Sequence, residues 1–245
     1  MQGRKPGFVE LGPPVSLITL ENAERSYQVG ENTVKALGPV SLSLEQGEFV
    51  VILGPSGSGK TTLLNLIAGI DRPSSGSCEV AGRDLTQLDR AGLLEYRRQH
   101  VGVVFQAFNL IPNLTARENV EIVAELTGTH LDVVEVLDSV GLGHRLDHFP
   151  HEMSGGEQQR VAIARALVKN PTIVLGDEPT GNLDLATSKK VLEVFQRVHQ
   201  QGKCVILVTH HVALTELATR VVHISDGAIK QDLKKEAGSL DRLDW

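Results

Sequence analysis

The chain has 245 residues, enough for one large domain or for one domain with an inserted subdomain. Hydrophobic residues make up 41% and charged residues 22%, as in an ordinary soluble globular protein. The formal net charge of −6 lacks the basic surplus of a general nucleic-acid surface, and no apolar run approaches the ~18 residues of a membrane helix. A role at a membrane would therefore require a second subunit that supplies the span.

The start of the chain precedes the motifs that carry chemistry. Residues 1–14 are rich in glycine and proline and have no apolar core, which predicts a loose tail. Short β-like stretches at 16–20, 33–37, 40–44 and 49–53, with turn signals between them, predict an antiparallel sheet. Tyr27 lies in this region, and its residue type alone favours a packed core ring.

A glycine-rich segment after the apolar run 49–53 dominates the sequence. Gly54, Gly59, Lys60 and Thr61 fit the pattern G-x-x-x-x-G-K-[ST], and a helical pattern follows. Glycines let backbone N–H groups turn inward around an anion, and a helix starting near Lys60 adds its positive end. Lys60 supplies a mobile charge, and the Thr61 hydroxyl suits Mg²⁺. The motif predicts a nucleoside triphosphate site made by Gly54, Pro55, Ser56, Gly57, Ser58, Gly59, Lys60, Thr61 and Thr62.

The middle of the chain alternates between β and α patterns. The expected elements are a strand at 77–80, a turn at 82–84, helices at 90–98, 115–126 and 131–140, and a buried strand at 101–105. Gln106 ends that last strand, where α/β sheets bind ligands, so it is suited to a metal or water contact. Thr115 and Glu118 form a capping-box pattern. Successive helices without a strand between them predict a helical insert.

A second candidate anion site begins at Ser154. Ser154 and Glu157 again fit a capping box, and the helix is predicted to run to about Lys169. Gly155 and Gly156 disfavour a helix start unless the backbone must come close to something. An anion is a natural candidate, because N–H groups and the helix dipole point outward there. An ordinary capped helix explains the same residues equally well.

Polar side chains follow two further apolar strands. The strand at 172–176 leads into Asp177 and Glu178, and the strand at 204–208 leads into Thr209 and His210. Successive strand residues face opposite ways, so the two carboxylates should have different roles: Asp177 for Mg²⁺, and Glu178 for the attacking water. His210 can donate to a phosphate oxygen or hold the catalytic carboxylate. Solvated carboxylates and a surface histidine are the plainer alternatives.

The end of the chain completes the sheet. The sequence predicts a turn at 180–184, a helix at 185–198 and a strand pair at 220–225 and 228–231, joined by a hairpin turn at Asp226-Gly227. Residues 232–245 are charged and small, which indicates a short helix or a frayed tail.

Taken in order, these motifs resemble the nucleotide-binding subunit of an ABC transporter, from Ser16 to Gln231. The matching segments are the phosphate loop 54–62, the Q-loop at Gln106, the signature at 153–157, the Walker B strand into Asp177 and Glu178, the D-loop at 182–184 and the switch His210. Residues 161–167 and 177–184 are similar to the lipoprotein-releasing, macrolide-efflux (MacB-like) and cell-division (FtsE-like) group. His211 stands where the family usually has aspartate, which leaves the hydrogen bonding near His210 open.

The resemblance implies a fold and its boundaries. The expected fold is α/β, a P-loop NTPase core with a mostly parallel sheet, an N-terminal antiparallel β leaf and an α-helical insert. The ATPase domain would span 15–232, with a helical subdomain at about 107–170, between the tail 1–14 and a short tail 233–245.

The resemblance also implies cofactors and residue roles. ATP and Mg²⁺ are the expected ligands. Glu178, His210 and Gln106 would serve hydrolysis, and Thr61, Gln106 and Asp177 would hold the metal. Tyr27 would stack on the adenine. Ser154, Gly155 and Gly156 would contact the γ-phosphate held by a second copy, and Asp184 is also assigned to the nucleotide.

The implied partners are a second copy, joined through ATP, and a membrane-spanning permease subunit. Residues 106–152 would dock on that permease, so the chain would lie at the inner face of the cell membrane. One alternative is an ABC ATPase that regulates a membrane partner in cell-wall remodelling or division without transport. A soluble ABC protein of DNA repair or translation is disfavoured, since such proteins usually carry long coiled coils or two ATPase units.

Overall fold

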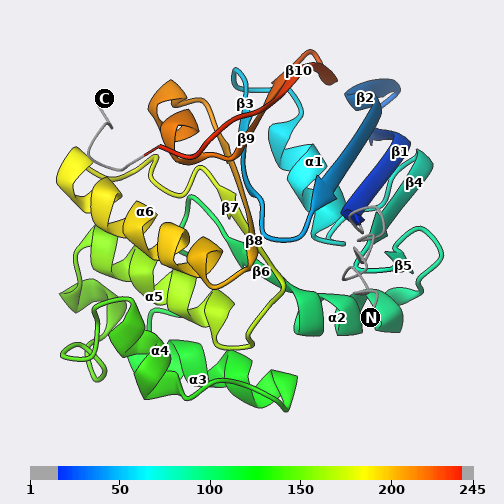
Figure 1. The fold of residues 1–245 in the computed structure, drawn as a ribbon. Coiled ribbons are helices and arrows are strands. Elements are labelled where there is room, and N and C mark those ends of the chain that lie inside the picture. Colours follow the sequence, from blue (N-terminus) through cyan, green and yellow to red (C-terminus); the bar gives the residue numbers. More distant parts are fainter. Residues whose placement is uncertain (1–15, 239–245) are drawn as a thin grey trace, which may run out of the picture.

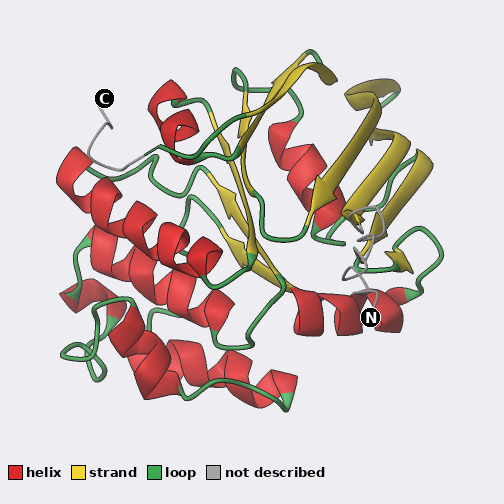
Figure 2. Ribbon diagram, viewed as in Figure 1, coloured by secondary structure: helices red, strands yellow, loops and turns green. Residues whose placement is uncertain are grey.

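The computed structural model describes residues 16–238, which form two sheets and the helices around them (Figures 1 and 2). The strands are β1 (Ser16–Val29), β2 (Asn32–Glu45), β3 (Phe49–Leu53), β4 (Ser75–Val80), β5 (Arg83–Asp84), β6 (Val101–Val104), β7 (Ile173–Asp177), β8 (Cys204–Thr209), β9 (Arg220–Ser225) and β10 (Ala228–Lys234). The α-helices are α1 (Lys60–Ile67), α2 (Arg90–His100), α3 (Ala116–Thr127), α4 (Val133–Ser139), α5 (Gly155–Leu167) and α6 (Leu185–Gln200). The predicted tail 1–14 lies outside the described residues.

The larger sheet has six strands in the order β10-β9-β3-β8-β7-β6. Neighbours from β9 to β6 pair in parallel, and only the β9–β10 hairpin is antiparallel. The smaller sheet has four strands in the order β2-β1-β4-β5 and is antiparallel throughout. Parallel strands bring their carboxyl ends to one edge, where α/β proteins bind ligands. The predicted fold class is therefore confirmed.

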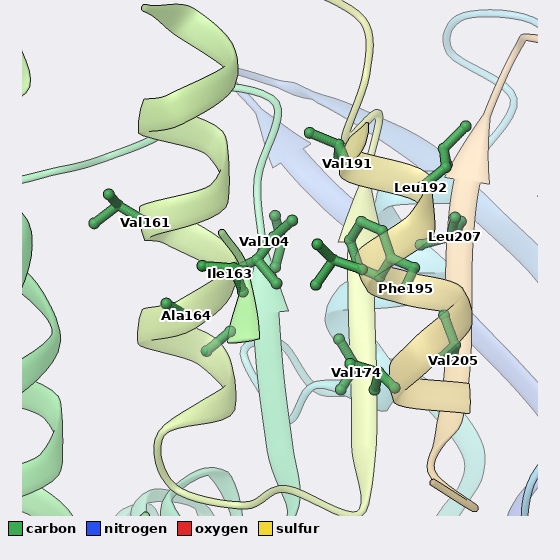
Figure 3. Packing of buried hydrophobic residues seen from close by; sticks show 14 of the residues in the cluster. Val104, Val161, Ile163, Ala164, Val174, Val191, Leu192, Phe195, Val205 and Leu207 are labelled. Carbon is green, nitrogen blue, oxygen red and sulfur yellow. The ribbon is translucent and has the colours of Figure 1, made fainter. Parts of the chain in front are cut away.

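Alternating side chains of β3 explain why the larger sheet is covered on both faces. Phe49 and Val51 join the core beneath α3, α5 and α6, whereas Val50 and Ile52 join the core shared with α1 and the smaller sheet. Figure 3 shows part of the first core, where Phe195 of α6 and Ile163 of α5 lie over Val104, Val174 and Val205 of the strands. A strand buried on both faces reads as a continuous apolar run, as observed here.

The predicted N-terminal antiparallel sheet is confirmed, but the expectation that it consists of four short strands was wrong. β1 and β2 are two long strands of 14 residues each. Gly38 and Pro39, the turn signal between the expected strands 33–37 and 40–44, lie inside β2, where register shifts interrupt the β1–β2 pairing. Such irregularities accommodate proline, which has no N–H to donate. The fourth stretch, 49–53, is β3 of the larger sheet and pairs in parallel with β8 and β9.

Two smaller predictions also need correction. Arg83–Asp84, expected as a turn, is the short strand β5 beside β4. Residues 232–234, expected as helix or tail, continue β10. Arg220 of β9 donates to both carboxylate oxygens of Asp232 at 2.7 Å. This pair holds the end of β10 against β9, which explains why the strand continues.

The sequence correctly predicted short features that require a particular backbone conformation, such as helix caps and a hairpin turn. Thr115 and Glu118 form the capping box of α3, and Ser154 and Glu157 form that of α5. Asp226 and Gly227 both have positive φ angles, 51° and 69°, as the hairpin signal requires. Within residues 16–238, none of the helices has the length and apolar character to cross a membrane.

Candidate functional site

The carboxyl edge of the larger sheet carries a cavity of about 690 Å³. It is lined by Ala36, Pro55, Ser56, Gly57, Ser58, Gly59, Lys60, Thr61, Thr62, Gln106, Asp177, Glu178 and His210. These residues come from β2, from the loop before α1 and the first turn of α1, and from positions at or just after the ends of β6, β7 and β8. Parallel strands thus bring together most of the residues that the sequence motifs predicted.

The glycine loop curves between β3 and α1 because its glycines adopt left-handed backbone angles. Gly57 has φ 76° and Gly59 φ 100°. A Cβ on Gly59 would lie 2.7 Å from the carbonyl oxygen of Ala36, so close approach to β2 also requires glycine there. Helix α1 begins at Lys60, whose side chain is nearly buried. Its Nζ donates to the carbonyls of Gly54 at 2.8 Å and Pro55 at 2.9 Å.

The β9–β10 turn is joined to the glycine loop by a backbone hydrogen bond. The N–H of Gly227 donates to the Ser58 carbonyl at 3.0 Å, and the N–H of Gly38 donates to the Gly227 carbonyl at 2.7 Å. One hairpin turn therefore holds both the glycine loop and the smaller sheet.

Thr61 and Asp177 meet across the cavity. The Thr61 hydroxyl lies 3.2 Å and 3.0 Å from the two carboxylate oxygens of Asp177. Burial raises the pKa of Asp177, and the neighbouring Glu178 charge raises it further, while the Thr61 hydrogen bond and the Lys60 charge oppose the shift. These oxygens form a donor pair suited to a hard cation.

Glu178 has a separate set of partners. Its Oε2 accepts from the Thr209 hydroxyl at 2.8 Å, while Oε1 accepts from the His210 backbone N–H at 3.0 Å and lies 2.7 Å from His210 Nδ1. Glu178 has φ 45°, so the chain has left β7 at this residue. Strand alternation is therefore the wrong reason for separating Asp177 from Glu178, although their partners do differ.

Gln106 lies at the rim of the cavity, exposed to solvent. Its Nε2 donates weakly to Asn182 Oδ1 at 3.4 Å, and Asn182 Nδ2 donates to the Gln106 carbonyl at 3.3 Å. Behind this pair, the buried side chain of Gln159 donates to the Pro179 carbonyl at 2.7 Å. The segments after β6 and β7 are thus joined side by side.

Tyr27 is not among the residues that line the cavity. Its hydroxyl donates to Asp71 Oδ2 at 2.7 Å, and Arg25 donates to the same oxygen at 2.9 Å. The Arg25 guanidinium lies 4.6 Å from the centre of the Tyr27 ring. The ring is therefore fixed in place and half-buried.

The predicted second anion site also lies outside the cavity lining. At the start of α5, the Ser154 hydroxyl accepts from the Glu157 N–H, and Glu157 Oε2 accepts from the Ser154 N–H at 2.8 Å. A Cβ on Gly156 would lie 1.9 Å from Thr187 Cγ2 on α6. Close helix packing within the chain thus explains Gly156, whereas Gly155 would meet only ordinary contacts at 3.5 Å.

Asp184 caps the neighbouring helix α6. Its carboxylate accepts from the Thr187 N–H at 3.0 Å and from the Thr187 hydroxyl at 2.6 Å. These hydrogen bonds lower the pKa of Asp184. Thr187 therefore links the cap of α6 to the first turn of α5.

Several supporting residues were missed by reasoning from the sequence. Thr209 is fully buried and donates to Glu178, and Ala36 comes from a distant strand to line the cavity. Arg165 donates to the carbonyls of Phe108 and Asn109 and holds the loop after Gln106. Only Thr209 gave a local signal, as a hydroxyl at the end of an otherwise apolar strand.

Comparison with known proteins gives a consistent family assignment. The model of the ABC transporter family matches residues 37–181. The macrolide export ATP-binding/permease protein MacB of Rhodopirellula baltica is 42% identical over 92% of this chain and 34% of its own length. An uncharacterized ABC transporter ATP-binding protein of Thermotoga maritima is 43% identical over 87% of this chain and 94% of its own. The chain thus spans about a third of the MacB relative.

Solved structures agree with this assignment. A dimeric bacterial ABC transporter cassette superposes with a TM-score of 0.83 and 39% identity, covering 90% of this chain and 99% of its own. The same cassette in a post-hydrolysis dimer bound to ADP and phosphate also gives a TM-score of 0.83, with 38% identity over the same shares of both chains.

Proposed function

This chain belongs to the ABC transporter family and is an ABC-type ATPase, and from that premise we propose that its glycine loop and strand ends bind and hydrolyse ATP. One observation carries the proposal. Lys60, the Thr61–Asp177 pair and the Glu178–His210 pair all line a single cavity at the carboxyl edge of the sheet.

The phosphates occupy the glycine loop. Gly57 and Gly59 give the loop the curvature that turns successive N–H groups toward an anion, and α1 adds its positive N-terminal end. Lys60 moves its ammonium from loop carbonyls to phosphate oxygens, which are stronger, charged acceptors. Tyr27, fixed by Asp71 and Arg25, provides the flat surface on which the adenine stacks.

The residues present fit Mg²⁺. The Thr61 hydroxyl and the Asp177 carboxylate are hard oxygen donors within 3.2 Å of one another, and the Gln106 side chain lines the same cavity. We assign these three residues to hold the ion. When bound, Mg²⁺ neutralises charge that develops on the phosphate oxygens.

Glu178 acts on the water. Its carboxylate orients the attacking water and takes a proton as the new oxygen–phosphorus bond forms. The bond from phosphorus to the bridging oxygen breaks, and its electron pair leaves with ADP. Thr209 and His210 hold the carboxylate through three contacts, which keeps its position fixed during this step.

The start of α5 acts in trans. Ser154, Gly155 and Gly156 do not line their own chain's cavity, so we assign them to the γ-phosphate held by a second copy. Asp184 accepts a hydrogen bond from Thr187, and Thr187 packs against Gly156. We therefore assign Asp184 to the same surface. ATP then joins two copies, and hydrolysis separates them, which shifts an open–closed equilibrium. The dimeric relative supports this arrangement.

We propose that the motion drives a membrane-spanning permease in export or lipoprotein extraction. The MacB relative is by name an ATP-binding/permease protein, and this chain matches only a third of it. The ATPase would therefore lie at the inner face of the membrane, with Gln106 and the loop held by Arg165 facing the partner.

The first test is turnover by the Glu178→Gln variant. The amide cannot accept a proton, so ATP hydrolysis should fall by about 10²-fold or more, while ATP binding persists and traps a dimer. Glu79→Gln, an exposed change on β4, is the matched control and should turn over normally. Normal hydrolysis by Glu178→Gln, measured as phosphate production, would contradict the assignment.

The second test identifies the partner. The Glu178→Gln protein is used to pull down detergent-solubilised membrane proteins with and without ATP. A multi-span protein that co-purifies would support the transporter role. Recovery of only soluble proteins or nucleic acid would overturn it.

A further inference from the structure

A second cavity adjoins the nucleotide site. Its volume is about 550 Å³, and we call it the annex cavity. It is lined by Leu53, Gly54, Pro55, His210, His223, Ile224, Ser225, Lys230 and Gln231. Pro55 and His210 also line the nucleotide cavity, so the two spaces meet at these residues.

The two cavities differ in charge. The nucleotide cavity contains two carboxylates, Asp177 and Glu178, whereas the residues lining the annex cavity include none. Its lining instead provides three basic side chains, His210, His223 and Lys230. The nucleotide cavity combines Lys60 with these two carboxylates, so an anion that moves from it into the annex cavity leaves both carboxylates and meets another lysine, Lys230.

The carboxylates around the annex lining already have partners. Glu178 contacts His210 Nδ1 at 2.7 Å from the side of the nucleotide cavity. Asp226 accepts from the Ser225 hydroxyl at 2.9 Å at the hairpin turn. Asp232 is paired with Arg220 through two contacts of 2.7 Å. None of these three carboxylates contacts His223 or Lys230 in the described residues, so these two basic side chains carry the basic character of the cavity.

The glycine loop and His210 form the boundary between the annex cavity and the nucleotide cavity. A Cβ on Gly54 would lie 2.2 Å from the Ile224 carbonyl, so the glycine loop packs directly on β9. The shared boundary is formed by Pro55 and by His210, whose side chain is 56% exposed while its Nδ1 contacts Glu178. A group leaving the neighbourhood of Glu178 in this direction passes the His210 ring.

We propose that the annex cavity binds the inorganic phosphate released from ATP, as an exit site beside the nucleotide. This inference rests on the proposed function. Phosphate carries one to two negative charges near neutral pH and accepts several hydrogen bonds, which His223, Lys230 and Gln231 are suited to donate. The carboxylates of the first cavity repel it, and the annex residues receive it.

The test measures phosphate binding and ATP cleavage separately. The double variant His223→Gln/Lys230→Ala removes the two basic annex side chains that the catalytic assignment does not use. The matched control, His130→Gln/Lys190→Ala, removes an exposed histidine and an exposed lysine elsewhere. Inorganic phosphate is titrated into each full chain by calorimetry with and without ADP, and cleavage of ATP is followed by chemical quench in a single turnover.

The annex variant should bind phosphate about tenfold more weakly, as loss of a charge-assisted contact implies, and phosphate should inhibit its turnover less. Its cleavage rate should stay within about twofold of wild type, like that of the control. Equal phosphate affinity in the two double variants would overturn the exit site. If the wild type failed to cleave ATP, the proposed function would fall, while the titration would still decide whether the annex binds phosphate.

Discussion

The glycine-loop cavity and the start of α5 are the two anion sites that we propose, and they differ in what surrounds them. The cavity gathers Lys60, Asp177, Glu178 and His210 from separate elements. At α5, Ser154 and Glu157 satisfy each other within a single turn. The cavity thus gathers its proposed catalytic groups within one chain. The start of α5 offers a helix N-terminus, to which we assign no catalytic group.

We propose that this difference is the reason for two anion sites in one chain. A helix N-terminus favours an anion but cannot orient a water or hold a metal. In the proposed function the cavity does both, but Ser154, Gly155 and Gly156 are not part of its lining. We infer that each site completes the other across a pair of molecules, and the predictions below separate their contributions.

The largest effect is expected at the cavity, from Lys60→Ala. The Lys60 ammonium is the cation closest to the loop and is nearly buried. Its loss removes charge-assisted contacts to phosphate, so ATP affinity should fall about 10- to 100-fold. Nucleotide titration of the purified chain measures this. Lys190→Ala, at an exposed site on α6, is the control. Near-normal affinity in Lys60→Ala would contradict the phosphate-loop assignment.

An intermediate effect is expected at α5, where two adjacent glycines should behave differently. Gly156→Ala forces a methyl group against Thr187, which its bond to Asp184 restrains, and should cost about 1–3 kcal/mol of stability. Gly155→Ala meets only ordinary contacts, so the fold should tolerate it while ATP-dependent dimerisation weakens. Denaturant unfolding and light scattering measure the two effects.

Equal loss of stability in both variants would show that the glycines serve packing alone. A fully stable Gly156→Ala would instead contradict the contact with Thr187.

The smallest effect is expected for Asp177→Asn in Mg²⁺-free buffer. Because the folded state raises the pKa of Asp177, its contribution favours folding at low pH and is lost as pH rises through that raised pKa. Removing the charge should therefore raise the melting temperature at pH 7, within about 3 °C. The gain should shrink as pH falls below the raised pKa and vanish once pH is also below the ordinary pKa of an aspartate. A lower melting temperature at pH 7 would contradict a destabilising charge.

Sequence reasoning succeeded where a short segment has its own backbone requirement. The glycine loop, the capping boxes at Thr115 and Ser154, and the Asp226-Gly227 turn are examples. It failed where distant packing decides. The path of β2 through Pro39 and the assignment of β3 to the larger sheet depend on strand partners far along the chain.

The same distinction holds within the site. Glu178 and His210 could be predicted as strand-end residues, but the contact between them and the support from Thr209 require β7 and β8 to be neighbours. Gly156 was predicted to approach an anion, and the structure gives it a neighbour on α6. A glycine pattern indicates that another group lies close to the backbone, but it does not identify that group.

The most direct test of the paired-site account uses mixed dimers. Lys60→Ala and Ser154→Arg chains, each in the Glu178→Gln background and differently tagged, are co-purified, and the ATP retained per dimer is measured. If each ATP lies between Lys60 of one copy and Ser154 of the other, the mixed dimer has one intact site and should retain one ATP. Either parent alone should retain almost none. A mixed dimer that retains no more ATP than its parents would contradict the paired sites.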